Sequence, residues 1–108
     1  MTDVVQVSTA TPSREAAEEL ARSAVKEHLA ASAQIVGPAV SVFWHLGEFG
    51  TADEWRLLLV TTEGRYPALQ DHLVKHHPWE NPEIAAVPVT LATDAYAGWV
   101  KETVTPGD

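Results

Sequence analysis

The sequence predicts an α+β protein with a ferredoxin-like βαββαβ order, an antiparallel sheet and an additional C-terminal helix. Short segments rich in branched and apolar residues alternate with two segments of helical periodicity. The two central strand segments follow one another across a glycine-containing turn, which indicates a hairpin. At 108 residues the chain has the length of a single domain, and we assign residues 1–108 to it.

The first half of the chain supplies one strand, one helix and the start of the hairpin. Residues 4–9 are short and β-branched, which predicts a strand. A Pro-Ser pair then marks a helix start, and a stripe of small apolar residues extends the helix over residues 14–32. Residues 33–46 predict the second strand, and the Gly37-Pro38 pair inside it is typical of a bulge or bend.

The third predicted strand, residues 55–62, follows a turn at residues 47–50. Its segment 57–60 is apolar at every position, whereas a strand with one solvent-exposed face would alternate apolar and polar residues. We therefore expect this strand to be covered on both faces. One helix layer covers only one face, so a second subunit is the simplest cover for the other.

The second half of the chain completes the expected order. Residues 65–76 have helical periodicity, and a proline is tolerated in the first turn. Residues 84–91 predict the fourth strand, where Pro88 favours an edge position. Thr93 is a good N-cap for a last helix that runs to about residue 104.

Composition excludes several classes of function. The formal net charge is −8, from 15 acidic and 7 basic residues, which argues against a nucleic acid or an anionic membrane as partner. The chain has no cysteine, so disulfides and thiolate metal ligation are excluded. No stretch has transmembrane length, and the first residues lack the pattern of a signal peptide. We expect a cytoplasmic protein.

Three histidines near the end of the second helix are the candidate metal ligands. His72 and His76 are four residues apart, so they share one face of the helix, and His77 follows directly. Imidazole without a thiolate favours weak binding of Cu(II) or Zn(II) over Cu(I). The alternative is that these histidines are solvated groups that stabilise the helix C-terminus.

The segment from His76 to Ile84, with the sequence HHPWENPEI, is a stiff connector. Proline fixes φ and pushes the preceding residue towards extended geometry, so the two prolines hold the link in few conformations. An indole and two carboxylates lie within it. Such a connector either presents side chains to a partner or serves only the fold.

This segment resembles the His-Pro-Tyr-Glu-x-Pro-Glu-Ile motif of the CutA proteins, the divalent-cation-tolerance family. Residues 29–33, LAASA, resemble the Leu-Ala-Ala-Cys segment of that family. Residues 94–99, DAYAGW, resemble its closing Asp-x-x-Tyr-x-x-Trp helix. The Ser-x-Tyr-x-Trp-x-Gly…Glu hairpin of the family is matched by residues 41–44 with Gly47 and Glu54. The four blocks occur in the family's order and cover nearly the whole chain.

The resemblance implies a homotrimer of ferredoxin-like subunits, with clefts between subunits that resemble those of PII signalling trimers. It implies a role in divalent-cation tolerance, with copper as the associated ion, and a cation, a small effector or another protein as the ligand of the cleft. Ser32 stands where the family has its cysteine, which leaves only the weak, imidazole-based binding described above. The residues assigned to the cleft are Trp44, Glu54, His77, Trp79 and Glu83.

Two other functions are weighed against this one. The chain could be a purely structural or engineered trimer without a metal function. It could also be an enzyme that uses His77 and Glu83 as an acid–base pair. The order of residues contains no nucleophile elbow and no phosphate-binding glycine loop, so we expect a binding protein and not an enzyme.

Overall fold

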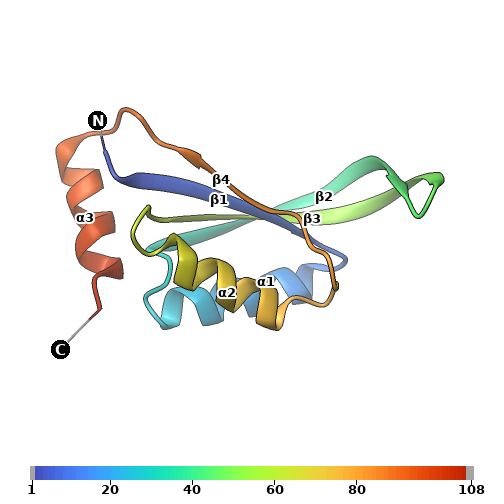
Figure 1. Ribbon diagram of the computed structural model, residues 1–108, viewed down its shortest axis with the longest axis horizontal. Helices are drawn as coiled ribbons and strands as arrows, with labels where there is room; N and C mark the ends of the chain where they lie inside the picture. The colour runs from blue at the N-terminus through green and yellow to red at the C-terminus, as the bar shows by residue number, and fades with distance from the viewer. Residues whose placement is uncertain (1, 107–108) are drawn as a thin grey trace.

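The computed structural model describes residues 2–106 and forms one four-stranded sheet with three helices (Figure 1). The strands lie in the order β2-β3-β1-β4, and every neighbouring pair is antiparallel. This is the predicted ferredoxin-like arrangement with an added C-terminal helix. The elements are β1 (Val4–Thr11), α1 (Arg14–Lys26), β2 (Ser32–His45), β3 (Glu48–Thr62), α2 (Tyr66–His76), β4 (Ile84–Pro88) and α3 (Asp94–Val104).

Helices α1 and α2 cover one face of the sheet (Figure 1). Alternate residues of β1 and β3 point into this layer, because side chains of a strand alternate between its two faces. Val7 pairs with Leu59 in the register, and both are fully buried. Leu20 of α1 and Leu69 of α2 pack on them. The main hydrophobic core therefore lies between the sheet and these two helices.

The opposite face of the sheet is only partly covered. Helix α3 lies at the end of the sheet where β1 begins (Figure 1), and its Val100 packs against Val4 and Val60. Beyond α3 this face carries a mixed set of exposed and half-buried side chains. We call it the open sheet face, and its residues are Gln6, Ser8, Gln34, Leu58, Ala85 and Val87. A single chain thus covers one face of segment 57–60 fully and the other only in part.

Several element ends differ from the sequence-based expectation, and strand β1, for example, runs to Thr11 and not only to residue 9. Helix α1 ends at Lys26 and not near residue 32, because Glu27 forms the C-cap and His28 adopts a left-handed φ of 59°. The apolar stripe continues past the helix because Leu29 and Ala30 still pack on the core from the turn. Strand β4 ends at Pro88 and not at residue 91.

Strands β2 and β3 form a longer hairpin than expected, because β3 begins at Glu48 and not at residue 55. Leu46 and Gly47 have φ values of 50° and 80°, which suits a tight two-residue hairpin turn. The hairpin beyond the bulge, residues 39–54, projects past the helices (Figure 1). We call this part the hairpin arm. The predicted bulge lies between Val36 and Ala39, at the Gly37-Pro38 pair itself.

Candidate functional site

His77 lies directly after the end of α2, where its extended backbone turns the chain into the connector. Its side chain is buried, and its Nε2 lies 2.9 Å from the carbonyl oxygen of Ala10 and 3.1 Å from Thr9 Oγ1. Its Nδ1 lies 3.1 Å from the backbone nitrogen of Trp79 and accepts that hydrogen bond. The hydrogen bonds therefore assign the tautomer with the proton on Nε2. His77 fastens the connector to β1.

Burial lowers the pKa of His77 below its ordinary value, and the hydrogen bond to the Ala10 carbonyl opposes this shift only in part. The neutral imidazole is the form that the site holds. Both ring nitrogens of His77 have partners inside the chain, namely the Ala10 carbonyl oxygen and the Trp79 backbone nitrogen. Among residues 2–106, no three His, Asp or Glu side chains form a ready metal cluster. Metal binding by these histidines stays a prediction.

His72 lies between α2 and α1, and only 10% of its side chain is exposed. Its Nε2 lies 2.8 Å from Ser23 Oγ, and its Nδ1 lies 3.3 Å from Glu27 Oε2. Burial and the neighbouring His76 lower the pKa of His72, while Glu27 acts in the opposite direction. At the helix interface, His72 therefore has one hydrogen-bond partner, Ser23, and one neighbouring carboxylate, Glu27.

His76 is exposed, and its ring centroid lies 4.5 Å from that of His72. It borders a hollow of about 280 Å³ between the two helices. Sequence reasoning found the histidine pair but missed the partners that α1 supplies. Glu19, Ser23 and Glu27 recur at intervals of four and so share one helix face, which is the signal that was available. The hollow is lined by Ala16, Glu19, Leu20, Ser23, His76 and Pro78.

The carboxylates assigned to the cleft have partners within the chain. Glu83 accepts two hydrogen bonds from Arg56, at 3.0 and 2.8 Å, and this guanidinium lowers the pKa of the carboxyl group. The same pair raises the pKa of Arg56. Glu54 accepts a hydrogen bond of 2.7 Å from the hydroxyl group of Ser41. Arg56 was missed by sequence reasoning, because its cross-strand position next to the connector appears only once the sheet is assembled.

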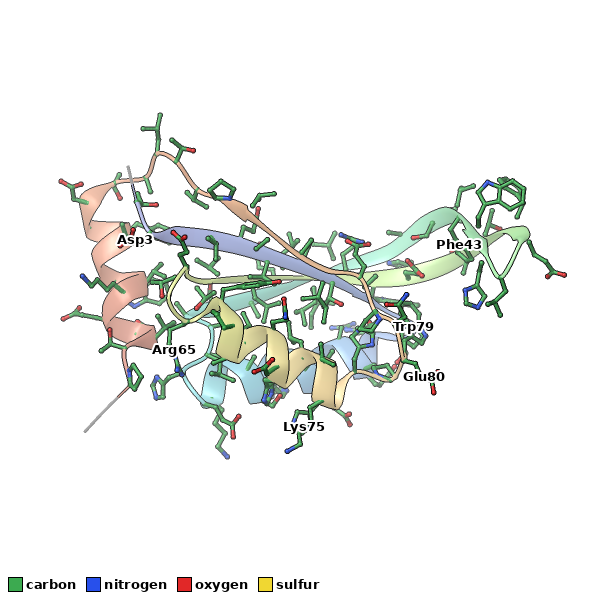
Figure 2. All side chains as sticks on the ribbon, viewed as in Figure 1. Asp3, Phe43, Arg65, Lys75, Trp79 and Glu80 are labelled. Carbon is green, nitrogen blue, oxygen red and sulfur yellow. The ribbon has the colours of Figure 1, made fainter. Side chains whose placement is uncertain are left out.

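The two tryptophans assigned to the cleft lie on different parts of the chain. Trp44 is on the hairpin arm, 74% exposed, with its ring edge against Phe49. Trp79 is half-buried beside the His77 ring, with centroids 5.4 Å apart. Figure 2 shows the labelled Phe43 on the arm and Trp79 on the connector beyond α2. One chain therefore presents two separate aromatic surfaces.

The fold and the His77 connector define a small ferredoxin-like protein with a projecting hairpin arm. The chain belongs to the family described as CutA1 divalent ion tolerance protein, whose model matches residues 5–103. This confirms the resemblance seen in the four sequence blocks. Within residues 2–106, no helix has the length and hydrophobicity needed to cross a bilayer.

Known proteins similar to this chain carry the same family name. The Divalent-cation tolerance protein CutA of Thermus thermophilus is 34% identical over 102 residues, which is 94% of this chain and 97% of the relative. Protein CutA 1, chloroplastic, from Oryza sativa is 36% identical over 90 residues, and that match spans 83% of this chain and about half (51%) of the plant protein. The crystal structure of CutA from Xylella fastidiosa superimposes with a TM-score of 0.93 at 30% identity, covering 96% of this chain and 100% of that chain.

Proposed function

We propose that this protein is a homotrimer that acts in divalent-cation tolerance and binds a cation or a small effector in clefts between its subunits. The observation that carries the proposal is the pairing of an open sheet face with a projecting apolar arm in a chain of the CutA1 family. The Thermus thermophilus relative is named for divalent-cation tolerance, which supports the same role here. We place the protein in the cytoplasm, as a single domain over residues 1–108.

The arm supports self-association because its apolar side chains face solvent in the single chain. Contiguous exposed apolar surface marks interaction sites in proteins. The outer strands β2 and β4 also leave sheet edges available, and such edges are usually covered or paired. The exposed side chains on the arm are Val40, Val42, Trp44, Leu46 and Phe49, with exposed fractions from 61% to 90%.

The arm and the open sheet face are different surfaces, so each copy can offer its arm to one neighbour and its sheet to another. Contacts of this kind must close, because an open series would grow into filaments. Three is the number of subunits that the family resemblance implies. The trimer would cover the face of segment 57–60 that a single chain leaves half open.

The trimer also brings the two aromatic surfaces together. The arm of one subunit, carrying Trp44 and Glu54, would lie beside the connector of its neighbour, carrying Trp79 and Glu83. Arg56 holds Glu83 in a fixed bidentate geometry, so the two side chains line the cleft in one arrangement. We assign the cleft to a weakly bound divalent cation such as Cu(II), or to a small effector.

Sedimentation equilibrium tests the assembly. The unchanged protein should sediment as a trimer at micromolar concentration, and the double variant Val42→Lys, Trp44→Lys should sediment as a monomer, because two ammonium groups would have to be buried in the contact. Val74→Lys is the matched control. Val74 is 52% exposed on α2, on the side of the sheet away from the arm contact. A monomeric unchanged protein would contradict the proposal.

Binding is favoured over the two alternatives. An acid–base pair of His77 and Glu83 would need groups free to exchange protons with a substrate, yet both His77 nitrogens and both Glu83 oxygens already have partners. Titration with copper, followed through tryptophan fluorescence, separates the binding protein from a purely structural trimer. Trp79, beside His77, is the indole expected to respond.

A further inference from the structure

We propose that each subunit binds a small zwitterion, a molecule with one carboxylate and one ammonium group, in the hollow between the β3–α2 turn and the C-terminal end of α3. This hollow, which we call the end hollow, has a volume of about 560 Å³. It lies at the end of the sheet away from the hairpin arm (Figure 1) and shares no residue with the cleft proposed between subunits. The inference therefore goes beyond the proposed function and does not depend on the trimer. The lining includes Asp3, Thr62, Glu63, Arg65, Lys101 and Val104.

Arg65 supplies the group that binds the carboxylate. Its Nε is the one buried side-chain nitrogen or oxygen atom within residues 2–106 that has no hydrogen-bond partner. Its Nη2 donates to the carbonyl oxygen of His28 over a long 3.4 Å. A buried donor without a partner costs stability, and a carboxylate accepts two parallel N–H bonds from one guanidinium. A small turn of the guanidinium towards the end hollow gives a carboxylate both donors, and only the long bond to His28 is given up.

Lys101 is the second cation of the end hollow. It lies in the last turn of α3, so it reaches the hollow from a different element than Arg65 does. In the part of the chain that the structure describes, neither cation forms an ion pair. Two cationic side chains that converge on one hollow from two elements favour an anionic group there.

Asp3 and Glu63 decide what the rest of the ligand carries. The backbone nitrogen of Glu63 donates to the carbonyl oxygen of Asp3 at 2.7 Å, which keeps these two acidic residues adjacent. Both are exposed, and neither forms an ion pair with another described residue. Their charges repel a polyanion such as phosphate, whereas an ammonium group on the ligand is attracted to them.

The four charged side chains line one hollow without pairing with one another. Figure 2 shows the labelled Asp3 and Arg65 beside α3. A ligand with both charges can bridge what the chain leaves apart, because each of its ends meets groups of the opposite sign. The wall also contains the buried Val104, which gives a short alkyl chain an apolar contact.

Calorimetry on the full chain at pH 7.5 tests the ligand class with four probes. These are 4-aminobutyrate, butyrate, butylamine and inorganic phosphate. The first carries both charges on one short alkyl chain, the next two carry one charge each, and phosphate carries only negative charge. We expect one saturable site per subunit for 4-aminobutyrate. Butyrate, butylamine and phosphate should each bind about tenfold more weakly or worse, since each lacks one charge-assisted contact.

Three variants and a control test the residues. Arg65→Gln and Lys101→Gln should each weaken 4-aminobutyrate about tenfold, and the exposed Lys101 can be changed without disturbing the core. Glu63→Gln should weaken 4-aminobutyrate but not butyrate, a difference that a general loss of stability would not produce. Lys75→Gln is the matched control, because Lys75 is an exposed lysine in the last turn of α2, far from the end hollow (Figure 2).

Four results would overturn the proposal. One is the absence of saturable binding of 4-aminobutyrate. Another is butyrate or phosphate binding as tightly as 4-aminobutyrate, which would leave the acidic residues without a role. The third is an unchanged affinity in Lys101→Gln. The fourth is an equal loss in Lys75→Gln and Lys101→Gln, which would assign the binding to the overall charge of the protein and not to the end hollow.

Discussion

His77 shows how one side chain can hold a connector in place through both of its ring nitrogens. Sequence reasoning recognised the residue as special, because it lies between a helix and a proline inside a family motif. Its role in holding the connector against β1 could not be predicted, because its partners on β1 are 67 and 68 positions away in the sequence. The spacing of the histidines favoured a metal cluster. Only the folded chain shows that the imidazole of His77 forms hydrogen bonds with β1.

The lowered pKa of His77 predicts a pH-dependent stability. Its folded-state pKa lies below the ordinary value of 6.5, so the unfolded chain binds more protons in the interval between the two. The free energy of unfolding should therefore be highest above pH 6.5 and fall as the pH drops from there towards the folded-state pKa. Urea denaturation between pH 5 and 8 measures this slope.

The variant His77→Gln isolates this contribution. It should be destabilised by about 2 kcal/mol at pH 7.5, because three hydrogen bonds of a buried side chain are disturbed. Its stability should change less between pH 7.5 and pH 5.5 than that of the unchanged protein. The residual slope belongs to His72, whose pKa is lowered as well. Equal slopes in both proteins would show that His77 is protonated as easily in the folded chain as in the unfolded chain.

At the scale of elements, the identity and order of the strands and helices could be predicted, whereas several of their ends could not. Hydrophobic periodicity marks which residues pack on the core, and Leu29 and Ala30 do pack there, although they lie in a turn after α1. The start of β3 was missed for a related reason. Residues 48–54 lie on the hairpin arm, beyond the core that gives a strand its apolar pattern.

The bulge in the hairpin depends on the absence of a side chain at Gly37. A Cβ atom there would lie 2.7 Å from Trp55 Cδ1 and 3.0 Å from the carbonyl oxygen of Glu54. Gly37→Ala should therefore lower the free energy of unfolding by about 1–3 kcal/mol, the usual cost of overpacking. Gly64→Ala is the matched control, because a Cβ atom there meets nothing within 4 Å. If the denaturant midpoints shift equally in both variants, Trp55 moves aside without lowering the free energy of unfolding, which would contradict the prediction.

At the scale of the whole molecule, a single chain leaves a sheet face and an arm uncovered. The unbroken apolar segment 57–60 indicated this from sequence, because one helix layer covers only one face of a strand. The covered face holds Leu57 and Leu59, both fully buried, while Leu58 on the other face is half-exposed. The partners of His72 at the interface with α1, Ser23 and Glu27, could not be predicted either, because one sequence does not reveal which faces of α1 and α2 meet.

The connector gives the last test of the assembly. Trp79 is only half-buried in one chain, and the two flanking prolines hold its backbone in one shape, so little entropy is lost when a neighbour packs on it. Truncating a buried interface indole costs on the order of 2 kcal/mol or more. Trp79→Ala should therefore melt at a lower temperature than the unchanged protein.

The concentration dependence distinguishes an interface from a local packing defect. When folding is coupled to assembly, the melting temperature rises with protein concentration. A weakened trimer should dissociate within the accessible concentration range, so the melting temperature of Trp79→Ala should depend more strongly on concentration than that of the unchanged protein. Thermal unfolding at three concentrations spanning two orders of magnitude measures this. A lower but concentration-independent melting temperature would assign Trp79 to packing on His77 within its own chain. An unchanged melting temperature would show that Trp79 is a surface residue and that the connector only links α2 to β4.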